Sequence, residues 1–434
     1  MARARLQALG LSVLNRISSS SWADRIGIRQ PMQRVIYWGS REGFRLSSTK
    51  LRHFQNRSGS RTRLSTTPLQ GLFDLSLDEE QQQITDMLKH FAEEQLRPVA
   101  HEADEAGRFP ETLREAATEL GLIHYAVSEA YGGIATVSSA QTQALIAETL
   151  AHGDFSLTAA LLASVSVANA LTRWGNADQQ ARYLPEFVSE ENPLRATMAI
   201  MEPGALFNPF KLVTTAILSG NQYHINGHKA LVLDAQSAEL FLVAAQTSDG
   251  IGLFLIDGGH QGLSWKPAQA MGLKAAETAE LILNDVVVPA SARLGDEEFS
   301  WQNFLDFGSL AWCAMATGCA QAVLDYTIPY CNERTAFGEP ISHRQGVAFL
   351  IAQMAIEVES MRLMTWRATT RADQGLSFQR EAYLARMFCS EKAMWVGTQG
   401  VQLLGGHGFT KEHPVERWYR DLRSVAVLWG GQHL

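Results

Sequence analysis

The sequence has few cysteines and no long uninterrupted apolar run. Only four cysteines occur among its 434 residues: Cys313, Cys319, Cys331 and Cys389. They form no Cys-x-x-Cys pair and have no histidines nearby at the spacing of a zinc site, so we predict buried free thiols in a reducing compartment and no metal site. No stretch of about 18 consecutive apolar residues occurs, and we therefore predict no membrane-spanning helix.

Acidic residues are almost absent from the first 70 positions. Residues 1–70 contain 13 Lys or Arg and only two acids, Asp24 and Glu42, a net charge of +11, whereas the remainder carries −19. Three interpretations of this Ser-rich basic segment remain open. It is a mitochondrial transit peptide, an amphipathic helix on an anionic membrane surface, or an arm that docks on the acidic body or on a partner. Because the body would repel phosphates, we expect no nucleic-acid partner.

Helical periodicity is predicted in two separate parts of the chain. The segment Ser76–Glu79 matches a capping box with Ser76 at the N-cap, and Pro110 is a favourable first position for a second helix. Further along, apolar residues recur at helical spacing before Gly375 and indicate one long bundle helix; they are Val347, Leu350, Ile351, Met354, Val358 and Met361.

Between these parts, residues 194–290 contain short β-like runs separated by turn residues. Asn226-Gly227 is a hairpin signal, and we predict a small antiparallel barrel or sandwich here. The predicted fold class is α+β multidomain. Its parts are a basic N-terminal extension (1–73), an N-terminal helical domain (74–192), a middle β domain (193–296) and a C-terminal four-helix bundle (297–434).

Five short motifs occur in order along residues 74–434. They are Phe91-Ala92-Glu93-Glu94, Glu129-Ala130-Tyr131-Gly132-Gly133, Met271-Gly272-Leu273-Lys274-Ala275-Ala276-Glu277-Thr278, Asn332-Glu333-Arg334-Thr335-Ala336-Phe337-Gly338, and Val401–Phe409 followed by Pro414–Asp421. In this order and at this spacing they resemble the acyl-CoA dehydrogenases, whose layout of helices, β domain and helical bundle agrees with the predicted domains.

The resemblance implies FAD bound between subunits. In the family an arginine contacts the pyrophosphate, and a guanidinium fork suits phosphate oxygens. A Gln-x-x-Gly-Gly segment of the neighbouring subunit approaches the adenosine diphosphate half, where small residues let the backbone come close. The matching cofactor-binding residues here are Arg334, Phe337, Gln345, Gln402, Gly405 and Gly406.

The position of the family's catalytic glutamate is occupied by Trp429. A neutral indole N–H is only a donor, so it cannot accept the α-proton of an acyl-CoA thioester. Some branches of the family place the base on the first helix of the C-terminal domain, and the matching position is near Gly308. Asp306 lies two residues away, about 200° around a helix, and is expected to point elsewhere. No catalytic residue is therefore matched; a shifted local alignment around Trp429 is the alternative.

The predicted flavin pocket departs from the family as well. Leu231-Val232-Leu233 stands where the family has Trp-Ile-Thr, and Leu233 cannot donate a hydrogen bond to the flavin ring as a threonine hydroxyl could. We therefore expect a more apolar ring pocket, with FAD held mainly by its phosphate half.

Three functions remain open on this basis. The first is an active FAD-dependent acyl-CoA dehydrogenase that passes electrons to an electron-transfer flavoprotein. The second is a catalytically silent subunit of a heteromer with a second dehydrogenase-like chain, and the third is a membrane-surface scaffold that uses residues 1–70. We expect a homodimer or homotetramer, or that heteromer. The expected location is the bacterial cytoplasm, with contact to the membrane surface, and the mitochondrial matrix is the alternative.

Overall fold

The computed structural model of this chain describes residues 76–135, 138–204, 206–295 and 299–429. They belong to one compact unit, Phe73–Leu434. The basic segment 1–70, with its three interpretations, lies outside the described residues. The predicted domain boundary near residue 73 therefore stays a prediction. Near the other two predicted boundaries, the chain changes from helices to strands after α9 (Ala177–Phe187) and back to helices before α10 (Trp301–Glu333).

Helices form the first part of the described chain. The first of them begins two residues later than the capping box predicted: Asp78, not Ser76, is the N-cap, and its carboxylate accepts a hydrogen bond from the Gln81 amide at 2.7 Å. The Gln81 side chain accepts from the Asp78 amide in return, so a capping box exists, shifted by two residues. The helices are α4 (Glu79–Phe91), α5 (Arg97–Ala106), α6 (Glu111–Glu119), α7 (Ala140–Gly153), α8 (Phe155–Trp174) and α9 (Ala177–Phe187).

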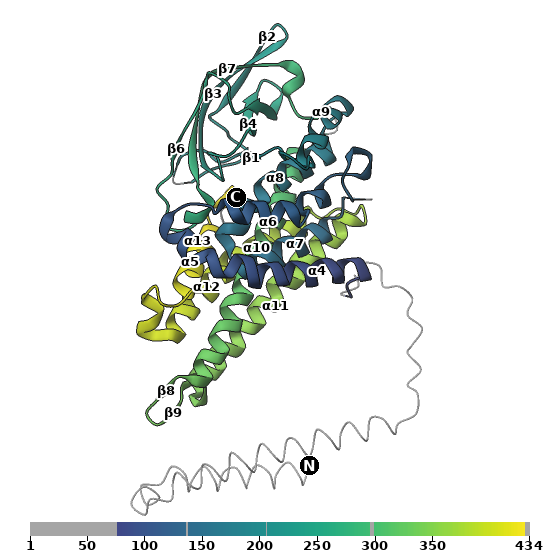
Figure 1. The fold of residues 1–434 in the computed structure, drawn as a ribbon. Coiled ribbons are helices and arrows are strands. Elements are labelled where there is room, and N and C mark those ends of the chain that lie inside the picture. The colour runs from purple at the N-terminus through teal and green to yellow at the C-terminus, as the bar shows by residue number, and fades with distance from the viewer. Residues whose placement is uncertain (1–75, 136–137, 205, 296–298, 430–434) are drawn as a thin grey trace, which may run out of the picture. The chain divides into compact units, whose positions relative to one another are not determined.

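A curled seven-stranded sheet follows and forms the upper part of the molecule in Figure 1. Its order is β1-β4-β2-β3-β7-β6, with β5 paired to β4. Most pairs are antiparallel, as predicted, but β1 runs parallel to β4. The strands are β1 (Ala196–Ala199), β2 (Thr215–Ser219), β3 (Gln222–Val232), β4 (Leu240–Thr247), β5 (Gly250–Asp257), β6 (Leu263–Pro267) and β7 (Ala279–Pro289).

The predicted hairpin turn at Asn226-Gly227 is wrong. These residues lie inside β3, where the register with β7 shifts between Ile225 and Gly227 as in a β-bulge. A Cβ at Gly227 would lie 2.4 Å from the Thr214 hydroxyl, so glycine is needed for close approach rather than for a turn. The β2–β3 turn falls instead at Gly220 and Asn221, where Gly220 has a φ of +61°.

The last part is a helical bundle, the lower half of Figure 1. The long helix predicted before Gly375 is confirmed as α11, and Met354, Val358 and Met361 are buried in the bundle core. The four cysteines are buried with free thiols, as predicted. The bundle helices are α10 (Trp301–Glu333), α11 (Gln345–Asp373), α12 (Gln379–Leu404) and α13 (Val415–Ser424); a small hairpin of β8 (Thr335–Ala336) and β9 (Glu339–Pro340) joins α10 to α11.

Two central helices, α8 and α10, are long and apolar enough to cross a membrane by length and composition. In each, 72% of the most apolar window is buried inside the protein. Both pack against other helices, and α8 also packs against β1, which is how the innermost helices of a bundle behave. Their apolarity therefore reflects the core, and the cavity described next lies between them.

Candidate functional site

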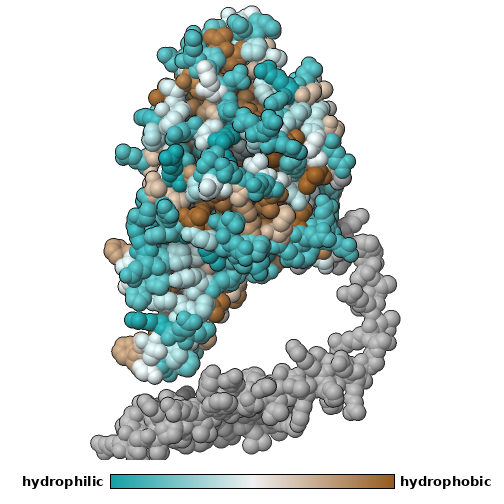
Figure 2. Space-filling model, viewed as in Figure 1, coloured by the Kyte–Doolittle hydropathy of each residue, from teal (hydrophilic) through white to brown (hydrophobic). Residues whose placement is uncertain are grey.

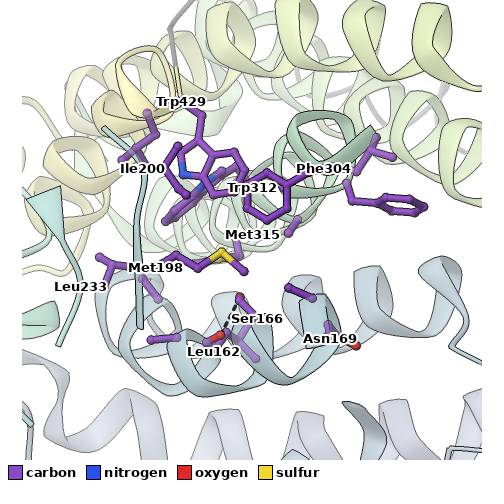
Figure 3. Close-up of a pocket in the computed structure, with 18 of the residues that line it drawn as sticks. Leu162, Ser166, Asn169, Met198, Ile200, Leu233, Phe304, Trp312, Met315 and Trp429 are labelled. Carbon is purple, nitrogen blue, oxygen red and sulfur yellow. Dashed lines mark hydrogen bonds between the residues drawn. The ribbon is translucent and has the colours of Figure 1, made fainter. Parts of the chain in front are cut away.

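A cavity of about 170 Å³ lies where the two helical regions meet the sheet. Its walls come from α8 and α10, from β1 and β3, and from the ends of α7 and α11. Figure 3 shows the side chains of Met198 and Met315 between Trp429 above and Ser166 of α8 below. An engineered cavity of about 150 Å³ in another protein holds a benzene molecule, so this space suits a small apolar group.

Trp429 forms the roof of the cavity. Its indole stacks on Phe304, with ring centroids 5.3 Å apart and planes 20° from parallel. Its backbone has a φ of +57°, a left-handed conformation that a bulky residue rarely adopts. Its amide donates a hydrogen bond to the Sδ atom of Met201 at 3.5 Å. This main-chain donor is therefore directed at a methionine sulfur.

Gly308 provides the space that this indole occupies. A Cβ built on Gly308 would lie 2.1 Å from the Cζ3 atom of Trp429, far inside any allowed contact. The two positions where the resemblance predicts a catalytic base are therefore neighbours, and an aromatic ring on one fills the space left by the missing side chain on the other. No single-sequence signal indicated this fit, because the two residues are separated by more than a hundred positions.

The described residues that line the cavity include no Asp, Glu, His or Cys. Asp306, the nearest acid in sequence, is not among them; it is buried, and one of its oxygens accepts a hydrogen bond from Gln302 at 3.0 Å. Burial raises the pKa of this carboxyl to about 6, with Gln302 and the charge of Arg386 opposing the shift. The described cavity thus contains no group able to accept a proton from a bound acyl chain.

The sheet-side wall of the cavity is largely apolar. Its apolar residues lie on β1 and β3 and on the segments that follow them: Met198, Ile200, Met201, Leu231 and Leu233. Thr197 of β1 also lines the cavity, and its hydroxyl donates to the carbonyl of Leu233 at 2.7 Å. A flavin ring has a polar edge of nitrogens and carbonyl oxygens, and no described side chain of this wall has an unused donor for it. The side chains of this wall therefore fit the ring half of FAD poorly.

A buried ion pair holds the turn beside this wall. The Lys229 ammonium lies 3.0 Å from Glu202, whose carboxylate also accepts from the amides of Val213 and Thr214 at 2.7 and 2.8 Å. Burial lowers the pKa of Lys229 to about 8, although Glu202 opposes the shift. Because neither group lines the cavity, we assign the pair a structural role: it fixes β3 against the turn that carries Met201.

The predicted cofactor residues lie elsewhere, at the free end of the bundle. Arg334, Phe337 and Gln345 sit on and beside the β8–β9 hairpin, and all three are exposed, Phe337 to 96%. The Arg334 guanidinium makes no hydrogen bond or ion pair with any described residue. Figure 1 shows this hairpin at the end of α10 and α11 that is remote from the sheet.

The other three predicted residues end α12. Gln402, Gly405 and Gly406 are exposed, and a Cβ at either glycine would meet no atom within 4 Å. Gly405 has a φ of +59° and ends the helix. None of the six predicted residues lines the cavity, so within one chain the structure brings them to the same end of the bundle but not to the cavity.

Sequence reasoning missed the residues that fasten this end together. The Tyr330 hydroxyl, on α10, lies 2.8 Å from Nδ1 of His407 and 3.3 Å from the carbonyl of Leu404. The Tyr326 hydroxyl lies 2.6 Å from Nδ1 of His413, and the two imidazoles stack 5.4 Å apart. These contacts hold the Gly405–Phe409 turn against α10, and no motif in the sequence predicted the pairing.

Comparison with known proteins follows the same division of the chain. Residues 78–191, 197–286 and 300–433 match the models of the acyl-CoA dehydrogenase N-terminal, middle and C-terminal domains. The short/branched chain specific acyl-CoA dehydrogenase of Rattus norvegicus is 33% identical over 359 residues, 80% of this chain and 82% of that protein.

Solved structures agree. Butyryl-CoA dehydrogenase from Megasphaera elsdenii superposes with a TM-score of 0.76 at 29% identity, covering 83% of this chain and 97% of that one. A glutaryl-CoA dehydrogenase from Mycobacterium smegmatis in complex with FADH2 superposes with a TM-score of 0.74 at 25% identity, covering 82% of this chain and 92% of that one. The chain belongs to the acyl-CoA dehydrogenase family, and the predicted fold class is confirmed.

Proposed function

We propose that this chain is an acyl-binding subunit of the acyl-CoA dehydrogenase family that does not itself abstract the α-proton. The observation that carries the proposal is the pairing of Trp429 with Gly308 in a cavity whose described lining has no acid. Removing a proton from a thioester requires a base within hydrogen-bond reach, and an indole is not one. Binding an acyl group requires only the apolar space that remains.

The size of the cavity supports a short or branched acyl group. About 170 Å³ is left beside the indole. The Rattus relative is named for short and branched chains, and the Megasphaera structure for butyryl-CoA. We therefore propose a short or branched acyl-CoA as the ligand, with the thioester end toward Trp429.

The exposed residues of the bundle support a role for FAD at a subunit interface. When bound, FAD supplies the hydride acceptor of the family's reaction. Arg334 is exposed, its guanidinium has no partner among the described residues and is suited to a pyrophosphate, and Gly405 and Gly406 leave room for a close approach of the ligand. Because the sheet-side wall does not fit the flavin ring, we propose that these residues serve FAD bound mainly by a neighbouring subunit.

Apolar side chains on the same end support assembly. Phe337, Phe349 and Ile356 are 96%, 64% and 59% exposed, and Figure 2 shows apolar patches on the surface of the lower bundle. Exposed apolar groups of this size favour burial against another chain. We call Phe337, Phe349 and Ile356 the bundle patch, and we propose that it joins this chain to a second copy or to a second dehydrogenase-like subunit that carries a base.

Dehydrogenation by this chain alone is the second candidate, favoured by its family. It would use FAD, and an electron-transfer flavoprotein would accept the electrons. Anaerobic mixing of the purified full chain with butyryl-CoA and 2-methylbutyryl-CoA separates the two. We expect binding in a calorimeter without bleaching of any bound flavin. Rapid bleaching by the chain alone would establish the second candidate instead.

For the location, we propose the bacterial cytoplasm with contact to the membrane surface through residues 1–70, whose net charge is +11. A basic segment is attracted to anionic lipid at about 1 kcal/mol per cation. Sedimentation with anionic vesicles, with and without residues 1–70, tests this contact. The mitochondrial matrix is the alternative location.

A further inference from the structure

Among the described residues that line the cavity, one side chain carries a charge: Arg173 of α8. Arg173 is exposed as well as lining the cavity, so it lies at the edge where the cavity opens to solvent. Its guanidinium carbon lies 4.0 Å from the centre of the Phe307 ring, a cation–π contact that holds the side chain against the cavity wall. The described lining contains no acid, so this edge of the cavity is positively charged.

The guanidinium of Arg173 keeps most of its hydrogen-bond donors. Within the described residues only Nη2 donates, to the carbonyl and hydroxyl oxygens of Ser138 at 3.3 and 3.2 Å. A guanidinium has five N–H groups in one plane, so Nε and Nη1 have donors left for another acceptor. Stacking on Phe307 uses the face of the group and leaves this edge open. Such an edge matches the two oxygens of a carboxylate.

Asp373 of α11 does not neutralise Arg173. Burial lowers the pKa of Arg173, and the charge of Asp373 opposes the shift, but the two groups form no ion pair. The oxygens of Asp373 instead accept from the Ser139 hydroxyl and from the amides of Ala140 and Gln141 at 2.8, 2.6 and 3.0 Å. Asp373 is thus held at the start of α7. Because an arginine keeps its proton at neutral pH, the cavity edge stays cationic.

Two side-chain amides of the same wall add unused donors. Gln143 Nε2 donates to the Tyr125 carbonyl at 2.8 Å, and Asn169 Nδ2 donates to Gln143 Oε1 at 3.0 Å. Each amide nitrogen carries two N–H groups and therefore keeps one. Asn169 lies one helical turn before Arg173 on α8, the helix that forms the floor of the cavity in Figure 3. This part of the wall offers donors and a positive charge.

We infer that the cavity selects an acyl group that ends in a carboxylate, with the carboxylate accepting hydrogen bonds from the open edge of Arg173. This inference rests on the proposed acyl binding and names the class of acyl group, the monothioester of a dicarboxylic acid. The exposed position of Arg173 lets the carboxylate stay partly hydrated, which lowers the desolvation cost of the pair. An ammonium would be repelled, and a plain alkyl chain would leave the donors of the wall unused.

The test compares acyl-CoAs of equal length with and without a terminal carboxylate. Butyryl-CoA is paired with succinyl-CoA, and pentanoyl-CoA with glutaryl-CoA. Each is titrated calorimetrically into the full-length protein, into Arg173→Met and into Arg182→Met. Arg182 of α9 is the matched control: it is also exposed and lies over a ring, 4.8 Å from the centre of Tyr183, but does not line the cavity.

We expect wild type and Arg182→Met to bind at least one dicarboxylic ligand about tenfold more tightly than the monocarboxylic ligand of the same length. Arg173→Met should lose that preference and bind butyryl-CoA as wild type does. If Arg173→Met does not fold, as judged by thermal unfolding, Arg173→Gln replaces it with the same expected loss.

The other outcomes overturn the inference in different ways. Equal affinity within both pairs in wild type overturns it and leaves acyl binding intact, as does a preference that persists in Arg173→Met. A loss of equal size for all four ligands in Arg173→Met would assign the guanidinium to a phosphate of coenzyme A instead. Failure of every acyl-CoA to bind to wild type overturns the proposed function together with the inference.

Discussion

At the scale of single residues, the proposed function rests on Trp429. Its indole occupies the space beside Gly308, stacks on Phe304 and directs its amide at Met201. Two predictions follow from this geometry, one for activity and one for stability.

Trp429→Glu should create proton abstraction. A carboxylate at this position would face the cavity with Gly308 leaving room beside it, and a positioned base contributes on the order of 10²–10⁴ in rate. The matched control is Trp429→Gln, which has nearly the same shape and no base. Both are made in a Leu233→Thr background so that the sheet-side wall has a donor for the flavin ring.

The measurement is anaerobic bleaching of bound flavin by butyryl-CoA. We expect the glutamate variant to exceed the glutamine variant by at least about 100-fold. A glutamate variant that binds both FAD and butyryl-CoA yet stays inert would contradict the proposal that a missing base at position 429 prevents proton abstraction.

Gly308→Ala should destabilise the protein by about 1–3 kcal/mol, because the new methyl group would meet the indole at 2.1 Å. Trp429→Ala should remove the clash, so the double variant should lose less than the sum of the two single variants. Urea unfolding of all four proteins measures this coupling. Strict additivity would mean that the indole is not held against Gly308 in solution.

At the scale of elements, helix α10 contributes residues to two separate places and carries one buried acid, Asp306. Its first turns carry Phe304 and Gly308 to the cavity, and its last turns carry Tyr326 and Tyr330 to the Gly405–Phe409 turn. Asp306 lies on the same helix and does not line the cavity, and one of its buried oxygens has no hydrogen-bond partner among the described residues. The charged form of the Asp306 carboxyl therefore lowers the free energy of unfolding.

This cost should appear as a pH dependence. The pKa of Asp306 is about 6 in the folded protein and 3.8 in the reference state, so the folded protein binds more protons between these values. Its contribution is therefore fully present below pH 3.8 and is lost as pH rises through 6. The free energy of unfolding of Asp306→Asn, measured relative to wild type, should therefore increase by about 2–3 kcal/mol between pH 4 and pH 7. Denaturant titrations at both pH values measure it; a pH-independent difference would contradict the assignment.

At the scale of the whole molecule, the cavity and the predicted cofactor residues lie in different regions. The cavity sits where helices meet the sheet, and Arg334, Gln402 and Gly405 lie at the free end of the bundle, near the bundle patch (Figure 1). One chain can therefore hold an acyl group in one place and present cofactor contacts to a neighbour in another.

Phe349→Asp should weaken assembly, because it places a charge in the bundle patch. Leu218→Asp is the matched control: Leu218 is 53% exposed, close to the 64% of Phe349, but lies on β2 in the sheet. Sedimentation velocity should show a smaller species for Phe349→Asp alone. An unchanged sedimentation coefficient in both variants would exclude the patch as an interface.

Local patterns in the sequence were sufficient for some of these features and not for others. The apolar residues of α11 recur at helical spacing, and this local pattern alone predicted the helix without knowledge of any tertiary contact. Asn226-Gly227 is a dipeptide that favours a hairpin turn. The pairing of β3 with β7 and the close approach of Thr214 place it inside a strand instead. The capping box moved by two residues because Asp78 and Gln81 satisfy the same rule as Ser76 and Glu79.

By itself, the sequence determined the family and the order of its three parts, and it predicted Trp429 at the position of the usual base, because each of these depends on residues close together along the chain. Only the tertiary structure decided that Gly308 receives that indole and that the lining of the described cavity contains no acid. These depend on side chains from distant segments whose contacts exist only after the chain has packed.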